Sequence, residues 1–154
     1  MCYTFSMEIW QSSIIIFVFL YSTLCFLLGF KNLYFKKNPF GLSRGFSFLG
    51  AFVWTDAVTF GAFFALAALL SFVLQEFIFL CLVYSVFWVI RSIGESIYWF
   101  LEQFVDKHRN KPETLKGHKM FPGEAVYVHY QIFWQCVSVV SIIASVYFFV
   151  ELFK

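Results

Sequence analysis

The chain has 154 residues, of which 61% are hydrophobic and only 13% are charged, and its formal net charge is +2. Soluble domains carry about 25% charged residues, and a chain this short has too little interior to hide so much apolar surface from water. The composition excludes an ordinary soluble domain and predicts an integral membrane protein. Most of its aromatic residues are phenylalanines, which suit packing against lipid and neighbouring helices.

The first apolar stretch, residues 9–30, reads IWQSSIIIFVFLYSTLCFLLGF and is long enough for a transmembrane helix, which needs about 20 residues. A cleaved secretory signal would begin with basic residues, have a shorter apolar core and end at a small-residue cleavage site. Here Glu8 precedes the stretch and no such cleavage site follows it. We therefore expect a retained membrane-spanning helix.

The first polar loop, residues 31–44, is basic and carries no acidic residue. Its positive charges are Lys31, Lys36, Lys37 and Arg44. The sequence Asn-Pro-Phe-Gly at positions 38–41 has the composition of a turn. After it, apolar residues recur at helical spacing, namely Leu42, Phe46, Leu49 and Phe52. This pattern predicts an amphipathic helix at the membrane interface that leads into the next span.

The second span is expected at residues 52–74, with Asp56 near its start. Small residues at helical spacing lie on one of its faces, namely Ala57, Gly61, Ala65 and Ala68. Small residues allow two helices to approach closely in lipid. We interpret this face as a tight helix–helix seam. Only Gln75 and Glu76 separate this span from the next, so the second and third helices are predicted to form a tight antiparallel hairpin.

The third span, residues 77–104, carries the polar side chains of greatest interest. At 100° per residue, one face within roughly 80° contains Tyr84, Trp88, Arg91, Glu95, Tyr98 and Glu102. Ionisable residues within a membrane helix are costly and usually functional. Arg91, Glu95, Tyr98 and Glu102 are therefore binding or pathway candidates.

The second polar loop, residues 106–124, precedes a fourth span at residues 125–150. The loop holds five basic residues, Lys107, Arg109, Lys111, Lys116 and Lys119. One predicted face of the fourth span holds Glu124, Val128, Gln131, Gln135, Ser138, Ile142 and Ser145. Amides and hydroxyls on such a face form hydrogen bonds between membrane helices.

The distribution of Lys and Arg predicts how the chain is threaded. Loops 31–44 and 106–124 hold four and five of these residues, whereas the connection at 75–76 and the N-terminus hold none and the C-terminus holds only Lys154. Cytoplasmic loops carry the excess of Lys and Arg. We expect an all-α bundle of four transmembrane helices, a single domain over residues 1–154 in the plasma or inner membrane, with both loops cytoplasmic and both termini outside.

This threading places several polar residues at one depth. A rise of 1.5 Å per residue puts Arg91 about 21 Å below Phe77, close to the inner boundary of a core of about 30 Å. The residues expected at that depth are Asp56, Arg91, Glu95, His129, Gln131 and Gln135. They form either an interfacial belt, in which Glu95 neutralises a snorkelling Arg91, or a polar cavity open to the cytoplasm. His129 lies about 160° from the Gln131–Gln135 face and does not line the same cavity.

The sequence gives little support for catalysis or for a cofactor. It contains no Walker loop, no GxGxxG and no HExxH motif. His108 and His118 lack ligand spacing, so we predict no metal site. The positive-inside pattern explains the basic loops, so we expect contact with the bilayer and its anionic headgroups and none with nucleic acid.

Three functions remain open. The favoured one is a non-catalytic subunit or partner-binding component of a membrane complex, bound to another membrane protein or to its own copy. The first alternative is an oligomeric transporter or channel whose cytoplasm-facing cavity uses Arg91, Glu95, Gln131 and Gln135. The second is a membrane-embedded enzyme at the inner boundary, with Glu95, Glu102 or His129 as acid or base.

Overall fold

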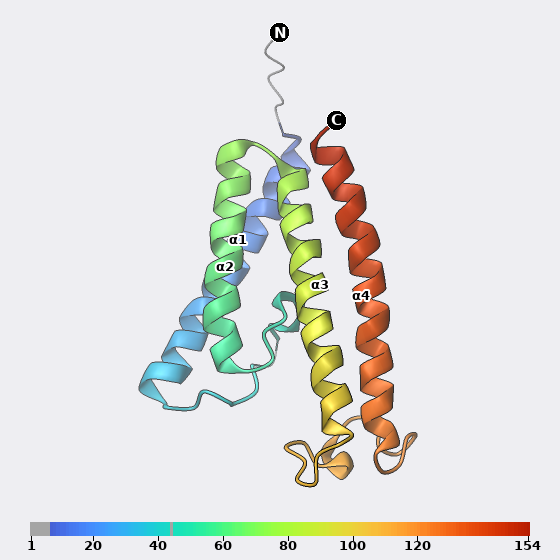
Figure 1. Ribbon diagram of the computed structural model, residues 1–154. Coiled ribbons are helices and arrows are strands. Elements are labelled where there is room, and N and C mark those ends of the chain that lie inside the picture. The colour runs from blue at the N-terminus through green and yellow to red at the C-terminus, as the bar shows by residue number, and fades with distance from the viewer. Residues whose placement is uncertain (1–6, 44) are drawn as a thin grey trace. The chain divides into compact units, whose positions relative to one another are not determined.

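The computed structural model describes residues 7–43 and 45–154, and within them the chain is all-helical with no strand. Figure 1 shows the four long helices, which are α1 (Ile9–Phe30), α2 (Trp54–Leu74), α3 (Phe77–Glu102) and α4 (Ala125–Leu152). Each is long and apolar enough to cross a membrane. The predicted all-α class and the four long apolar helices are confirmed. Residues 1–6 and Arg44 of the predicted basic loop lie outside the described residues.

Helix ends differ only slightly from the predicted ones. α2 begins at Trp54 rather than residue 52, α3 ends at Glu102 rather than 104, and α4 continues to Leu152 rather than 150. Three short elements lie between the long helices, namely the π-helical turn η1 (Lys31–Phe35) and the 3₁₀ turns η2 (Ser47–Leu49) and η3 (Pro112–Thr114). The chain divides into two compact units, one ending at Val83 and the other spanning Tyr84–Lys154.

In the first unit, α1 and α2 cross with their backbones in contact (Figure 1). A methyl group added to Gly61 would lie 2.6 Å from the backbone nitrogen of Phe26, and one added to Gly29 would lie 2.9 Å from the Cβ of Ala57. Glycine is required at both positions because any side chain would separate the helices. The tight seam predicted on α2 therefore has α1 as its partner.

The buried face of α2 overlaps the predicted small-residue face without matching it fully. Ala57 and Ala68 are fully buried and Gly61 is also buried, whereas Ala65 is only half-buried. The large ring of Phe64 lies on the buried face instead. Ile15 and Leu80 complete a small apolar core with α2, so the first turns of α3 belong to this unit.

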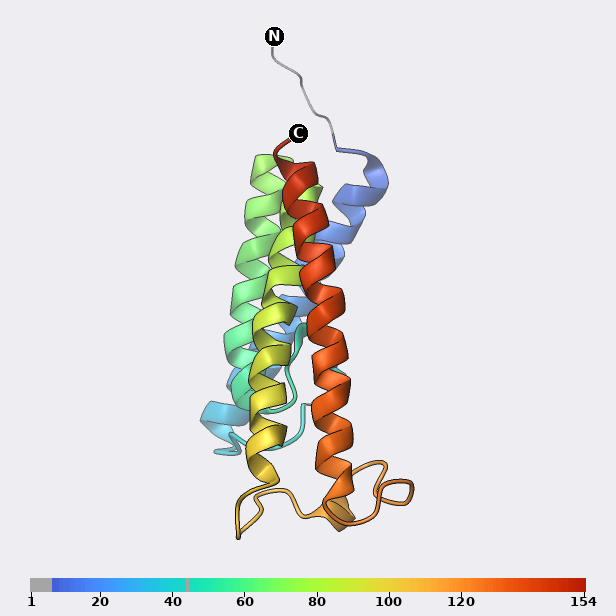
Figure 2. The same cartoon turned by 45° about the vertical axis from the view of Figure 1, so that its right-hand side comes forward.

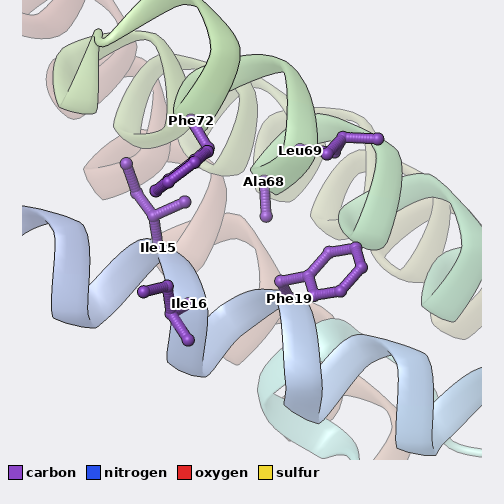
Figure 3. Close-up of a pocket in the computed structure, with 6 residues that line it drawn as sticks. All are labelled: Ile15, Ile16, Phe19, Ala68, Leu69 and Phe72. Atoms are coloured by element: carbon purple, nitrogen blue, oxygen red, sulfur yellow. The ribbon is translucent and has the colours of Figure 1, made fainter.

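An apolar pocket lies between α1 and α2. Its volume is about 200 Å³, and its lining consists of Ile15, Ile16, Phe19, Ala68, Leu69 and Phe72. Figure 3 shows Ile15 of α1 and Phe72 of α2 pointing toward one another across it. None of these side chains offers a hydrogen-bonding group, so the pocket does not suit a polar solute.

The predicted amphipathic helix that begins at Leu42 does not form. Leu42 instead makes an isolated antiparallel bridge with Val53, and the only helical element described between them is the short η2. Gly50 ends η2 with a φ of 68°, a left-handed conformation that reverses the chain and that glycine adopts readily. The apolar periodicity reflects burial of Phe46 and Leu49 in a folded loop.

In the second unit, α3 from Tyr84 onward and α4 lie side by side in both views (Figure 2). The buried residues of α4 are Val126, Tyr127, Trp134 and Ser141. On the predicted polar face of α4, the side chains of Gln131 and Ser138 form hydrogen bonds with Gln103 and Ser92, whereas Val128 and Ile142 are 40% and 46% exposed. The contact is centred on the rings of Tyr127 and Trp134, since aromatic side chains bury far more surface than amides do.

Candidate functional site

The α3–α4 contact follows a seven-residue repeat. Ser85, Ser92 and Trp99 are buried on α3, and Tyr127, Trp134 and Ser141 are buried on α4. A repeat of 3.5 residues per turn keeps one seam of each helix facing the other, as in a coiled coil. We call this set of side chains, with Trp88, Tyr130 and Ser138, the aromatic–serine seam.

Ring stacking and a hydrogen bond between two serines join the helices along this seam. The rings of Trp88 and Trp134 stack with centroids 6.2 Å apart at 15°. One helical turn further along, the Ser138 hydroxyl donates to the Ser92 oxygen at 2.8 Å. The ring of Trp99 stacks on that of Tyr130 with centroids 4.6 Å apart. Small hydroxyl side chains let the helices approach between the bulky rings.

Arg91 and Glu95 form an ion pair at the edge of the seam. The guanidinium and carboxylate groups are 2.9 Å apart, and the two side chains are 22% and 16% exposed. The second carboxylate oxygen of Glu95 accepts a hydrogen bond from the indole N–H of Trp99 at 3.2 Å. Both oxygens of Glu95 are therefore engaged by residues of its own helix.

Glu102, the last residue of α3, is covered by the loop that follows it. Its side chain is only 5% exposed, and its carboxylate accepts a hydrogen bond from the backbone N–H of Asn110 at 3.0 Å. The Asn110 amide also donates to the Tyr98 hydroxyl at 2.6 Å, and its carbonyl accepts from the Tyr127 hydroxyl at 2.5 Å. Asn110 thus joins the loop to both helices.

Further contacts fix the same loop to α4. Gln103 donates to the side-chain oxygen of Gln131 at 2.8 Å, and the Tyr130 hydroxyl donates to the carbonyl of Lys116 at 3.2 Å. We call residues 103–124 the tethered loop. Its basic residues are all exposed, and they are Lys107, Arg109, Lys111, Lys116 and Lys119.

The predicted site residues do not all meet. Arg91, Glu95, Tyr98, Glu102 and Gln131 contribute to the seam or to contacts with the tethered loop. His129 also contacts this loop, because its ring stacks on that of Phe121 with centroids 4.3 Å apart, but its side chain is exposed. Gln135 is exposed as well.

Asp56 lies in the first unit, at the start of α2. Its carboxylate accepts a hydrogen bond from the backbone N–H of Phe52 at 3.3 Å. This contact holds the chain that enters the helix, and a carboxylate in the first turn also suits the helix dipole. A structural role at the helix start therefore accounts for this residue.

Sequence reasoning missed Asn110, which lies in a polar loop with no periodic pattern.

It also overlooked that residues 41–45 read Gly-Leu-Ser-Arg-Gly, a match to the GxSxG pattern of serine hydrolases. That pattern acts when a sharp strand-to-helix turn exposes its serine. Ser43 is instead 3% exposed, and its hydroxyl donates to the carbonyl of Ala51 at 2.6 Å, so it is not a nucleophile here.

Within residues 7–43 and 45–154, no group of three or more His, Cys, Asp or Glu side chains is placed to hold a metal ion. No family model matches the sequence, and no curated protein or solved structure matches it either. The geometry of the seam and the tethered loop is therefore the basis for assigning a function.

Proposed function

We propose that the chain is a multi-pass integral membrane protein of the plasma or inner membrane. Loops 31–44 and 106–124 face the cytoplasm in this proposal, and both termini face outside. Four helices of spanning length and composition support it. The concentration of Lys and Arg in these two loops supports the orientation.

Within that location, the chain acts as a non-catalytic, partner-binding component of a membrane complex. The observation that carries this proposal is the burial of Glu102 beneath the tethered loop, with its carboxylate bonded to the Asn110 backbone. A buried carboxylate that accepts a backbone N–H fixes the loop's conformation. The loop then presents its basic side chains on a fixed surface, which reduces the ordering cost of binding.

The polar groups of α3 support binding rather than transport by this unit. Arg91 pairs with Glu95, and Glu95 also accepts from Trp99, so these groups have partners within α3 itself. The exposed charges of the tethered loop face solvent instead, with five basic residues against Asp106, Glu113 and Glu124. The partner in this proposal is an acidic surface of another membrane protein, with anionic headgroups as a secondary contact.

The test is purification of the tagged full chain from its own membranes in mild detergent. We expect a partner at fixed stoichiometry with the wild type, and its loss with the triple variant Lys107→Glu, Arg109→Glu, Lys111→Glu. The matched control places the same three charge reversals at Lys31, Lys36 and Lys37, and it should retain the partner. A chain that purifies as a monomer, or a partner lost equally from both variants, contradicts the proposal.

A second candidate, an oligomeric transporter or channel, is favoured by one observation in the first unit. Residues 45–53 are largely non-helical and lie against the middle of α1. Non-helical backbone at membrane depth occurs where it is covered by protein or lines water. Flux of ions or small solutes through purified protein in liposomes tests this candidate, and silence across a broad panel contradicts it.

A further inference from the structure

Residues 45–53 contact the middle of α1 rather than its end. The Tyr21 hydroxyl donates a hydrogen bond to the carbonyl of Gly45. The Tyr21 ring also packs against the ring of Phe46, with centroids 5.4 Å apart, and against that of Phe48 at 6.5 Å. Tyr21 lies well inside the span Ile9–Phe35, far from either end.

The depth of this contact follows from the α1–α2 seam. Gly61 of α2 packs directly on the carbonyl of Ser22, the neighbour of Tyr21, so these residues lie at one level. Gly61 follows Trp54, the first residue of α2, by seven positions, which corresponds to about 10 Å along the helix. Gly45 therefore lies about 10 Å beyond the first residue of α2, measured along that helix. This distance is about a third of the thickness of a hydrocarbon core of roughly 30 Å. Figure 1 shows this segment rising past the lower end of α2 before returning to it.

On one side of the segment, the side chains are buried and backbone groups form hydrogen bonds. Phe46, Leu49 and Ala51 are 7%, 0% and 0% exposed. The Ala51 N–H donates to the carbonyl of Phe46 at 3.3 Å, and the carbonyl of Phe52 accepts from the Ser43 N–H at 3.0 Å. These contacts fix the segment against α1 and α2.

The other side is exposed and polar in part. Gly45 and Ser47 are both exposed, although their backbone is non-helical or forms only a single 3₁₀ turn. The carbonyls of Gly45 and Ser47 accept hydrogen bonds from the Tyr21 hydroxyl and the Gly50 N–H. Exposed irregular backbone at membrane depth is nevertheless tolerated only where protein or water covers it. Exposed lysines, Lys31, Lys36 and Lys37, lie in the same unit on the chain leading to this segment.

We propose that residues 45–53 form a re-entrant segment, inserted from the cytoplasmic side, whose exposed Gly45 and Ser47 line a water-filled vestibule. This proposal rests on the membrane location proposed above. The vestibule admits water and small hydrated solutes, and it favours anions because the three lysines raise their local concentration. It is a hydrated site formed by residues of the α1–α2 unit.

Single cysteines in a cysteine-free full chain test this proposal in oriented membrane vesicles. Ser47→Cys is the informative variant, and its exposed side chain leaves the buried side of the segment intact. Lys36→Cys serves as the loop control. Leu66→Cys, at a position 62% exposed on α2, serves as the lipid-facing control.

The probes are small anionic and cationic methanethiosulfonates and a bulky polymer-linked maleimide, none of which crosses membranes. We expect Ser47→Cys to react with the small probes from the cytoplasmic side only, the anionic probe reacting faster by about tenfold or more. The polymer should label Lys36→Cys but not Ser47→Cys, and no probe should label Leu66→Cys.

Each other outcome overturns a defined part of the proposal. Polymer labelling of Ser47→Cys as fast as that of Lys36→Cys means that the segment lies at the interface. Absence of all labelling at Ser47→Cys means that protein or lipid covers it and that there is no vestibule. Equal rates for the two small probes remove the anion preference. Labelling of Leu66→Cys instead contradicts the membrane span itself, and hence the proposed location.

Discussion

The two units of this chain bring their helices together in opposite ways. In the α1–α2 unit, side chains are missing where the helices cross, so that Gly61 and Gly29 allow backbone to touch backbone. In the α3–α4 unit, large rings fill the contact, and serines occupy the positions between them. Both solutions suit apolar surroundings, where helix association depends on packing and interhelical hydrogen bonds rather than on hydrophobic burial.

This difference predicts opposite sensitivities to mutation. The α1–α2 unit should tolerate loss of peripheral side chains but no added atoms at its crossing point. The α3–α4 unit should tolerate small changes at its serines but lose much of its stability when a central ring is removed. Cys25, which is fully buried with its Sγ 3.5 Å from the carbonyl of Ala57, is a convenient reporter of the α1–α2 seam.

The largest effect is expected for Trp99→Ala. Its ring stacks on Tyr127 and Tyr130, and its indole N–H donates to Glu95. Removing the ring leaves a cavity and should lower the free energy of unfolding by about 3–5 kcal/mol. Detergent unfolding titrations measure the change. Trp10→Ala, at a position 51% exposed, should cost far less. Faster thiol labelling of Cys25 in Trp99→Ala would show that the units are not independent.

Gly61→Ala is expected to rank second. The added methyl group would lie 2.6 Å from the Phe26 backbone and force the helices apart, at a cost of about 1–3 kcal/mol. Labelling of Cys25 should become faster. The matched control is Gly94→Ala on α3, where an added methyl group meets nothing within 4 Å, and this change should be neutral or stabilising. Equal destabilisation by both variants would contradict the seam.

Glu102→Ala should destabilise the closed conformation of the tethered loop by about 1–3 kcal/mol, because the Asn110 N–H loses its acceptor. The measurement is limited trypsin digestion, since the peptide bonds after Lys107 and Arg109 become cleavable when the loop opens. Glu102→Gln keeps an acceptor oxygen and should retain most of the protection. Glu113→Ala, at an exposed position, should digest like the wild type. Unchanged digestion of Glu102→Ala would contradict the tether.

The smallest effect is expected for the Ser92–Ser138 hydrogen bond. Interhelical hydrogen bonds in membrane proteins contribute about 0.6 kcal/mol on average. A double-mutant cycle with Ser92→Ala and Ser138→Ala should give a coupling energy of that order. A coupling energy near zero would show that this hydrogen bond does not stabilise the seam.

The sequence predicts the helices of this fold well because length and apolar composition determine them. It also predicts that one face of α2 consists of small residues, since Ala57 and Gly61 are four positions apart. It does not predict that α1 packs there, because a small face admits any neighbouring helix. The connection through Gln75 and Glu76 indicated α3 as the neighbour, whereas the glycine contacts lie with α1.

The candidate site is predictable along α3 and at Gln131 and Ser138 of α4. Helical periodicity placed Arg91, Glu95 and Glu102 on one face, and the first two are indeed paired. The contacts of Asn110 were not predictable, because an irregular loop has no period and its partners are distant in sequence. The spacing of Leu42, Phe46, Leu49 and Phe52 predicts an interfacial helix that does not form, since burial by tertiary contacts can imitate helical spacing.

The stacked indoles of Trp88 and Trp134 have a practical consequence for experiments. Two indole chromophores with centroids 6.2 Å apart and planes at 15° are close enough for their electronic transitions to couple. The resulting near-ultraviolet circular dichroism depends on fixed side-chain packing and disappears when that packing loosens. The α3–α4 hairpin therefore carries its own optical probe, which reports its integrity in any detergent or lipid without an added label.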